Sequence, residues 1–293
     1  MNFFSLNTLW IFISGDDEDR FIDDIRFGLA VLKSKGIDEE NIKIFIDGEQ
    51  NLIHARFGNE LGNNQVLCLS ALEEELKTKS YKNVVLFTTG HGSEFGLAGN
   101  NPISPYKLLK IIRLIPEIER GLFVIGQCYA GIFNHIDAKP TKGSSEAEIC
   151  ILGSAGFSPS LSSSGSLEEK LPKKLIDLYG LKKWTANVFL FYFFLWLYEP
   201  QDIDGNGELT VMDAYKFVAI KTSEHINNEK KMWTFSSVFK IQQFKDRVSE
   251  MLDENEKILY LQEIDSILEL LHIYQEPFIC NSRFAQELKF EIS

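Results

Sequence analysis

The sequence predicts an α/β protein in which a mainly parallel sheet carries helices on both faces, followed by a C-terminal helical extension. In the first half of the chain, short apolar runs alternate with segments whose apolar residues recur every three or four positions. Each run is continuously apolar, as in strands that are buried on both faces of a parallel sheet. From about Ser223 the pattern changes to long, charged amphipathic segments, so we predict one α/β domain at 1–222 and a helical extension at 223–293.

The predicted elements follow one another in the order that such a sheet requires. The first strand, Thr8–Ser14, ends before Gly15, and a helix then runs from about Phe21 until Gly36 stops it. Further strands are expected at Asn41–Ile46, Asn83–Phe87, Leu122–Ile125 and Ile149–Leu152. Further helices are expected around Leu72–Leu76, from an N-cap at Ser104 to about Ile115, and at Val188–Tyr198.

Composition and charge exclude several classes of protein. With 44% hydrophobic and 25% charged residues, the chain has the composition of a folded globular protein. A net charge of −12 repels phosphate backbones, so we expect no nucleic-acid partner. The apolar runs Leu9–Ile13 and Val188–Tyr198 are too short to cross a bilayer, and the first lacks a basic leader, so we expect neither a membrane span nor a signal peptide. Four widely spaced cysteines predict reduced thiols in the cytoplasm.

Reactive side chains follow two of the predicted strands. His91 lies between two glycines after Asn83–Phe87, and Cys128 follows Leu122–Ile125. Because the carboxyl ends of parallel strands share one edge of the sheet, we expect the two side chains to meet there. A thiol becomes a strong nucleophile once a base removes its proton, and an imidazole can then protonate the leaving amine. The glycines beside His91 leave backbone N–H groups open to stabilise an oxyanion.

A His-Gly pair at one strand end, followed 37 positions later by Cys-x-x-Gly at another, resembles the caspase-like cysteine peptidases. This clan contains caspases, metacaspases and legumains, and the resemblance covers about Thr8 to Tyr215. It implies a cysteine endopeptidase that cleaves a protein substrate, with His91 as general base and then acid and Cys128 as nucleophile. It also implies an oxyanion hole formed by the backbone N–H groups of Gly92 and Cys128. Similarity to bacterial relatives implies a regulated stress or phage-defence setting.

The same resemblance assigns a pocket for the substrate residue that precedes the scissile bond. The family places it between the first strand's end, the residues before the Cys and the next strand's end, here Asp16-Asp17, Gly126-Gln127 and Ser154-Ala155. Two carboxylates favour a basic substrate residue, so we expect cleavage after Arg or Lys. Alternatively, these acids simply cap the helix that begins near Phe21. If the basic preference holds, Lys139 and Lys142 in the polar loop Asp137–Glu148 are candidate self-processing sites.

A second class of enzyme also fits part of the pattern. The Gly-Gln-Cys sequence ending at Cys128 begins like the nucleophile elbow of an α/β-hydrolase, although Ala130 occupies the place of its last glycine. That fold needs its His after the nucleophile. His225 or His272 would then serve as the base, and His91 would be incidental.

An acidic loop predicts a calcium site. Residues 202–213 match the EF-hand loop at positions one, three, five and six, with an Asp at position twelve where Glu is usual. We expect Ca²⁺ ligands from the side chains of Asp202, Asp204, Asn206 and Asp213 and from the backbone carbonyl of Glu208. The alternative is a plain tight turn. The loop also raises a non-enzymatic hypothesis, a calcium-binding interaction module whose thiol is inert.

The last part of the chain carries apolar stripes at helical spacing, including Ile258, Leu261, Ile264 and Leu268. These stripes exceed what one helix packed on an α/β unit needs. We therefore expect a docking element that binds a regulatory protein, or alternatively a cap that only stabilises the domain.

Overall fold

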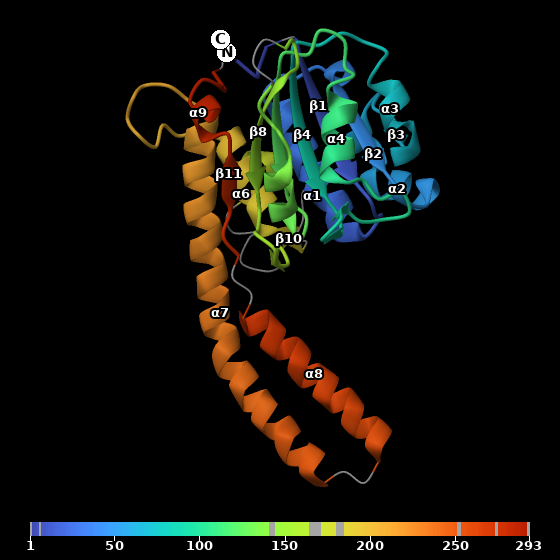
Figure 1. Ribbon diagram of the computed structural model, residues 1–293, viewed down its shortest axis with the longest axis vertical. Coiled ribbons are helices and arrows are strands. Elements are labelled where there is room, and N and C mark those ends of the chain that lie inside the picture. Colours follow the sequence, from blue (N-terminus) through green and yellow to red (C-terminus); the bar gives the residue numbers. More distant parts are fainter. Residues whose placement is uncertain are drawn as a thin grey trace.

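The central element of the structure is a seven-stranded sheet in the order β11-β8-β7-β4-β1-β2-β3 (Figure 1). The computed structural model describes residues 2–5, 7–140, 144–163, 171–179, 185–250, 253–272 and 275–291. Six strands run parallel: β1 (Thr8–Ser14), β2 (Ile42–Ile46), β3 (Val66–Leu67), β4 (Asn83–Thr89), β7 (Arg120–Ile125) and β8 (Glu148–Gly153). The seventh, β11 (Phe278–Cys280), pairs antiparallel with β8. All five predicted strands are present.

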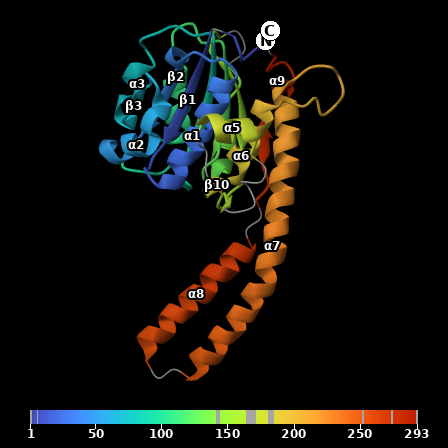
Figure 2. The ribbon, with the colours of Figure 1, turned by 180° about the vertical axis from the view of Figure 1, so that it is seen from behind.

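Helices cover both faces of this sheet because successive strand residues point to opposite sides. Trp10 and Phe12 face one core, and Ile11 and Ile13 face the other. The first core is covered by α1 (Asp19–Ser34), α2 (Gln50–Phe57), α5 (Lys173–Tyr179) and α6 (Val188–Tyr198), which lie in front of the sheet in Figure 2. The second is covered by α3 (Leu72–Glu75), α4 (Pro105–Ile112) and the short turn of helix Ala130–His135. The predicted fold class, a mainly parallel α/β sheet with helices on both faces, is therefore confirmed.

The aromatic run Val188–Tyr198 forms α6, as predicted, and lies in the first core, which is the larger of the two. Phe189, Phe193 and Trp196 are completely buried, since α6 contacts the sheet on one side and another helix on the other. Asn187 begins the helix by accepting a hydrogen bond from the Leu190 N–H at 3.0 Å. Within the described ranges, every helix is either too short or too polar to cross a lipid bilayer.

The C-terminal part differs from the predicted division at residue 223. One 40-residue helix, α7 (Val211–Glu250), runs through that position and is about 60 Å long at 1.5 Å per residue. Its first half packs on α6, and its second half pairs with α8 (Glu254–His272) in a hairpin that projects from the body (Figures 1 and 2).

After this hairpin the chain returns to the body. β11 adds to the sheet edge, α9 (Ser282–Ala285) follows, and Leu288 and Phe290 are buried in the larger core. Among the described residues, the hairpin of α7 and α8 projects from the body, whereas residues 278–290 pack against the α/β unit. Helix α7 thus crosses the predicted boundary at residue 223, and the division into domains stays a prediction.

Candidate active site

The two turns that carry His91 and Cys128 lie against each other at the carboxyl ends of β4 and β7. These strands are adjacent and parallel, with Thr88 opposite Ile125. The contact between the turns is so close that a Cβ added at Gly92 would lie 2.0 Å from the carbonyl oxygen of Cys128. A side chain at position 92 is therefore excluded by the backbone of the Cys turn, which explains why glycine follows His91.

The imidazole of His91 is held by an acidic residue of the loop before α1. Its Nε2 lies 2.8 Å from Oε1 of Glu18, and the edge of the Phe21 ring contacts it at 5.2 Å between centroids. Partial burial alone would raise the pKa of Glu18, but hydrogen bonds from Arg20 and His91 outweigh it and lower that pKa. Glu18 is thus kept ionised beside an imidazole that is 48% exposed.

The thiol of Cys128 is half-buried and faces the backbone of Ser160. The Ser160 N–H donates to Sγ at 3.3 Å, and Sγ lies 3.8 Å from the Ser160 carbonyl oxygen. The next residue, Tyr129, has a left-handed backbone (φ 55°), and its N–H donates to the carbonyl of Ser158 at 2.9 Å. In the described residues no hydrogen bond joins the thiol to His91. Their backbones are adjacent, but the two reactive side chains are not engaged with each other.

A buried carboxylate of α1 braces both turns. Asp24, only 3% exposed, accepts a hydrogen bond from the Thr89 hydroxyl at 3.0 Å and from the Asn187 N–H at 3.1 Å. The Asn187 side-chain amide in turn donates to the carbonyl of Gly126 at 2.6 Å and to the Ser160 hydroxyl at 3.1 Å. The network connects the end of β4, the Cys turn and the segment that contacts the thiol.

Sequence reasoning did not identify Asp24, Asn187 or Glu18. Asp24 is separated from Asn187 by 163 positions, so no local pattern joins them. One signal was available, because Asp24 is a charged residue beside the apolar positions of α1 that pack in the core. A carboxylate on the core side of a helix requires partners there.

The residues predicted for the substrate pocket lie in different surroundings in the structure. Asp16 lies near the imidazole, since one ligand atom each from Asp16, Glu18 and His91 falls within a 4.8 Å group. Asp17 turns away and accepts the Glu49 N–H at 2.7 Å. Of the predicted pocket acids, only Asp16 therefore lies beside His91.

The other two pocket residues are buried under the Cys turn. Ser154 is fully buried and donates to the carbonyl of Gln127 at 3.0 Å. Gln127 is 1% exposed, and neither atom of its amide has a hydrogen-bond partner in the described part of the chain. In this conformation neither side chain is presented to a substrate.

A groove lies next to the Cys turn. Its volume is about 850 Å³, and Tyr129, Phe157, Ser158, Glu269, Glu276 and Pro277 are among its lining residues. The groove thus begins at the residue after Cys128 and contains two carboxylates. Of the candidate processing sites, Lys139 lies in the loop before β8, and Lys142 lies outside the described residues.

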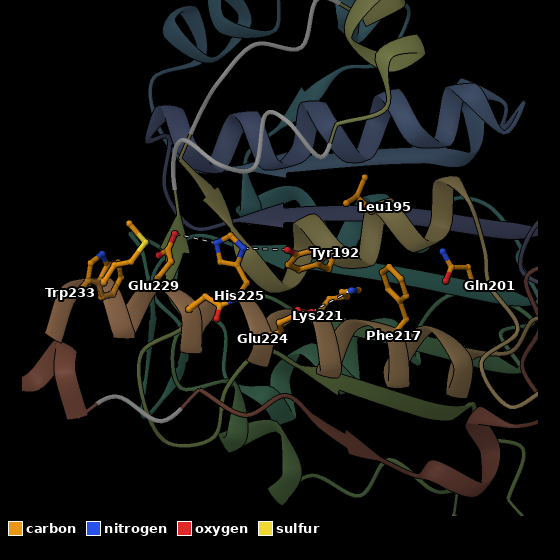
Figure 3. Close-up of a pocket in the computed structure, with 11 residues that line it drawn as sticks. Tyr192, Leu195, Gln201, Phe217, Lys221, Glu224, His225, Glu229 and Trp233 are labelled. Carbon is orange, nitrogen blue, oxygen red and sulfur yellow. Dashed lines mark hydrogen bonds and ion pairs between the residues drawn. The ribbon is translucent and has the colours of Figure 1, made fainter. Parts of the chain in front are cut away.

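The base required by the α/β-hydrolase alternative is engaged elsewhere. His225 of α7 is buried, with Nδ1 3.2 Å from the Tyr192 hydroxyl and Nε2 3.1 Å from both Ser163 and Glu229 (Figure 3). Burial raises the pKa of Tyr192 to about 12. These residues border a cavity of about 930 Å³ between α6 and α7. Tyr192, Ser163 and Glu229 thus hold the His225 imidazole away from Cys128, so this alternative loses its proposed base at His225. The His272 side chain lies outside the described residues.

The acidic loop folds into successive turns around its carboxylates. Asp202 accepts the N–H groups of Gly205 and Gly207, each at 2.8 Å, and backbone hydrogen bonds, that of Gly207 first, lower its pKa. Asp213 is fully buried and accepts the Ile203 N–H at 3.0 Å. One ligand atom each from Asp202, Asp204 and Asp213 falls within a 4.8 Å group.

The remaining predicted ligands differ in their side-chain contacts. The Asn206 side chain accepts the Glu208 N–H at 2.8 Å, and the Glu208 carboxylate pairs with Lys289. The predicted role of Glu208 uses only its backbone carbonyl, so this ion pair does not compete with it. Lys216, however, lies 3.0 Å from Asp204 and would compete with a cation.

Comparison with solved structures finds a likeness to a secreted C11 cysteine protease from Bacteroides thetaiotaomicron, solved in complex with an irreversible peptide inhibitor. The two chains are 12% identical, the TM-score is 0.28, and the match covers 50% of this chain and 48% of the other. The chain thus spans about half the length of that protease. No family model and no curated protein matches the chain.

Proposed function

We propose that the chain is a cysteine endopeptidase in which Cys128 is the nucleophile and His91 the general base and acid. The observation that carries this proposal is the backbone contact between Gly92 and Cys128 at the ends of two adjacent parallel strands. It brings a thiol and an imidazole to one edge of the sheet, which is the place where α/β proteins bind substrates. The resemblance of these two turns to the caspase-like peptidases supports the same roles.

The proposed reaction begins when His91 removes the thiol proton and the Cys128 sulfur attacks the carbonyl carbon of the peptide bond. The oxyanion that forms accepts hydrogen bonds from the N–H groups of Gly92 and Cys128. The C–N bond then breaks as His91 returns the proton to the amine. Water, deprotonated by His91, hydrolyses the thioester and frees the thiol.

Two details of the structure define what this reaction requires. Glu18 occupies Nε2 of His91, so Nδ1 is the nitrogen left to accept the thiol proton. The sulfur must leave the Ser160 backbone before it reaches the imidazole. A change of the Cys128 rotamer is therefore part of the proposed activation step.

The proposed substrates are polypeptides cut after Arg or Lys. Asp16 beside His91 offers a carboxylate to a basic side chain, and such a pair is a charge-assisted hydrogen bond. A fluorogenic peptide library that varies the residue before the scissile bond tests this directly. We expect Arg and Lys to dominate, and Asp16→Asn to weaken that preference more than Asp17→Asn does.

Cleavage after Asp or Asn would contradict the substrate class while leaving the Cys-His assignment intact. The absence of cleavage of any peptide in the library would instead contradict the enzyme itself. Asp17→Asn is the matched control, since its carboxylate binds the backbone of Glu49 and not the imidazole.

One observation favours the second candidate function, a calcium-binding module with an inert thiol. The Cys128 sulfur contacts the Ser160 backbone and not His91. Labelling with an electrophilic peptide distinguishes the two functions. An inert Cys128 thiol forms an adduct no faster than the exposed Cys68 thiol does, whereas a catalytic thiol reacts faster.

We propose in addition that loop 202–213 binds Ca²⁺, whether the chain is a peptidase or a binding module. Ca²⁺ bound only to the folded state at about 100 times its dissociation constant should raise the melting temperature by roughly 5 °C. Asp202→Ala should abolish this shift, whereas Glu256→Ala, which removes an exposed acid of α8, should preserve it. Neither heat of binding nor a thermal shift at millimolar Ca²⁺ would reduce the loop to a plain turn.

A further inference from the structure

One face of α7 carries a coiled-coil seam that continues beyond the body of the protein. The seam residues alternate at spacings of three and four: Val211, Ala214, Val218, Lys221, His225, Asn228, Met232, Phe235, Phe239 and Gln242. On an α-helix this spacing gives a stripe that drifts by about 20° per heptad, the pattern of helices that pack as coiled coils. The first three residues are fully buried in the core that contains α6. The seam thus already has a helical partner in its first half.

In the second half the same seam is uncovered. Met232 is 75% exposed, Phe235 87% and Phe239 64%, with Val238 beside them at 58%. The hairpin partner α8 does not cover these side chains, because it packs on Ile241 and Phe244 on another face of α7. The stretch 232–239 contains no charged residue. Exposed aromatic residues and Met in a charge-free stretch are characteristic of the centre of a protein interface.

We propose that this uncovered seam, Met232 to Gln242, is a dimerisation surface that binds the same seam of a second copy of the chain. The four exposed side chains present on the order of 500 Å², given about 200 Å² for a fully exposed Phe. Two copies together would bury roughly 1,000 Å², which reaches the lower limit of specific interfaces. A second copy therefore supplies enough area, and it supplies the helix that the seam spacing requires.

The arrangement of the two copies follows from where the body lies. The seam begins on the side of α7 on which α6 packs, so a parallel partner helix extended along the seam would run into the body. Antiparallel helices place the bodies at opposite ends. With the twofold axis at Ser237, Phe235 lies beside Phe239 of the second copy, and Met232 beside Gln242 of the second copy.

In the same register, polar residues at the two ends of the uncovered seam face each other. Asp246, four positions after Gln242, continues the seam spacing. Asn228 then lies beside Asp246 of the second copy, so an amide meets a carboxylate. The cavity of about 930 Å³ in Figure 3 borders Asn228, Met232 and Trp233. It gives the end of the second copy's helix space beside the body.

The oligomeric state of the full chain tests the proposal. Sedimentation velocity up to about 100 µM, above the micromolar dissociation constants of weak interfaces, should show a monomer–dimer equilibrium. Phe235→Glu and Phe239→Glu should each raise the dissociation constant about 30-fold or more, since each buries a charge at the centre of the interface. Leu259→Glu, at an equally exposed apolar site on α8, should not change it. A wild-type chain that remains monomeric, or Phe235→Glu dimers as tight as wild type, would overturn the proposal.

Disulfide cross-linking tests the direction of the helices in a Cys68→Ala background, which removes the exposed native thiol. A mixture of Met232→Cys and Gln242→Cys chains should cross-link between copies. Met232→Cys alone should not, because antiparallel helices hold the two copies of residue 232 about 15 Å apart at 1.5 Å per residue. Rapid cross-linking of Met232→Cys alone would exclude the antiparallel dimer.

Discussion

Cys128→Ala and His91→Ala should each lower peptide cleavage by at least about 10⁴-fold, because each removes one member of a unit that acts together. Cys128→Ala removes the atom that forms the acyl-enzyme. His91→Ala leaves the thiol without a positioned base and the leaving amine without an acid. Steady-state cleavage of the best library peptide measures both losses, and a peptidyl electrophile reports on the thiol separately.

Two controls separate chemistry from folding. Neither side chain belongs to the hydrophobic cores, so both variants should keep the melting temperature within a few degrees of the parent. Cys68→Ala removes an exposed thiol that lies 60 positions before Cys128. This variant should leave peptide cleavage and the labelling of Cys128 unchanged. A folded His91→Ala or Cys128→Ala enzyme with parental cleavage would contradict the proposed roles.

Much of the fold was predictable because buried parallel strands are short, continuous apolar runs. Thr8–Ser14 has the predicted bounds, and the other four predicted strands differ from the structure by at most two residues at an end. The run Val188–Tyr198 was also predictable as a buried helix from its length and apolar character. In these segments the local pattern and the tertiary environment agree.

The C-terminal region was not predictable in the same way. The amphipathic pattern of α7 continues across residue 223, and periodicity does not show which partner covers a helix face. β11 has only three residues, and its hydrogen bonds to β8 join segments more than 120 positions apart. Such short edge strands depend on tertiary pairing and carry little signal of their own.

The adjacency of the two turns that carry the candidate site was predictable, whereas the residues that hydrogen-bond to these turns were not. The order His91 before Cys128 at successive strand ends was visible in the sequence, whereas the bond from Asn187 to the Gly126 carbonyl was not. Nor could the sequence show that Asp17 caps the Glu49 backbone while its neighbour Asp16 lies near His91. These choices depend on loop conformation.

Gly92→Ala should be the most damaging change at the site that leaves every reactive atom in place. The new Cβ would lie 2.0 Å from the Cys128 carbonyl oxygen and 3.0 Å from the Cys128 nitrogen. Both are backbone atoms, so no side-chain rotation relieves the clash, and the His and Cys turns must separate. Because a displacement of about 1 Å at a reacting centre can cost 10²-fold, we expect kcat/KM to fall about 100-fold.

Gly156→Ala is the matched control for this prediction. A Cβ at Gly156 meets no atom within 4 Å, and neither glycine has the positive φ that would strain an alanine. Gly156→Ala should therefore keep the parental kcat although it lies in the segment that contacts the Cys turn, where its carbonyl accepts the Gly131 N–H at 3.0 Å. Since Gly156 also lines the groove beside Tyr129, kcat and not KM is the value to compare. If the two variants cleave peptide equally well, the spacing of the turns does not control the reaction. If only Gly92→Ala is impaired, while its thiol still reacts with iodoacetamide, the defect lies in the geometry that joins Cys128 to His91 and the oxyanion hole, as the proposed mechanism requires.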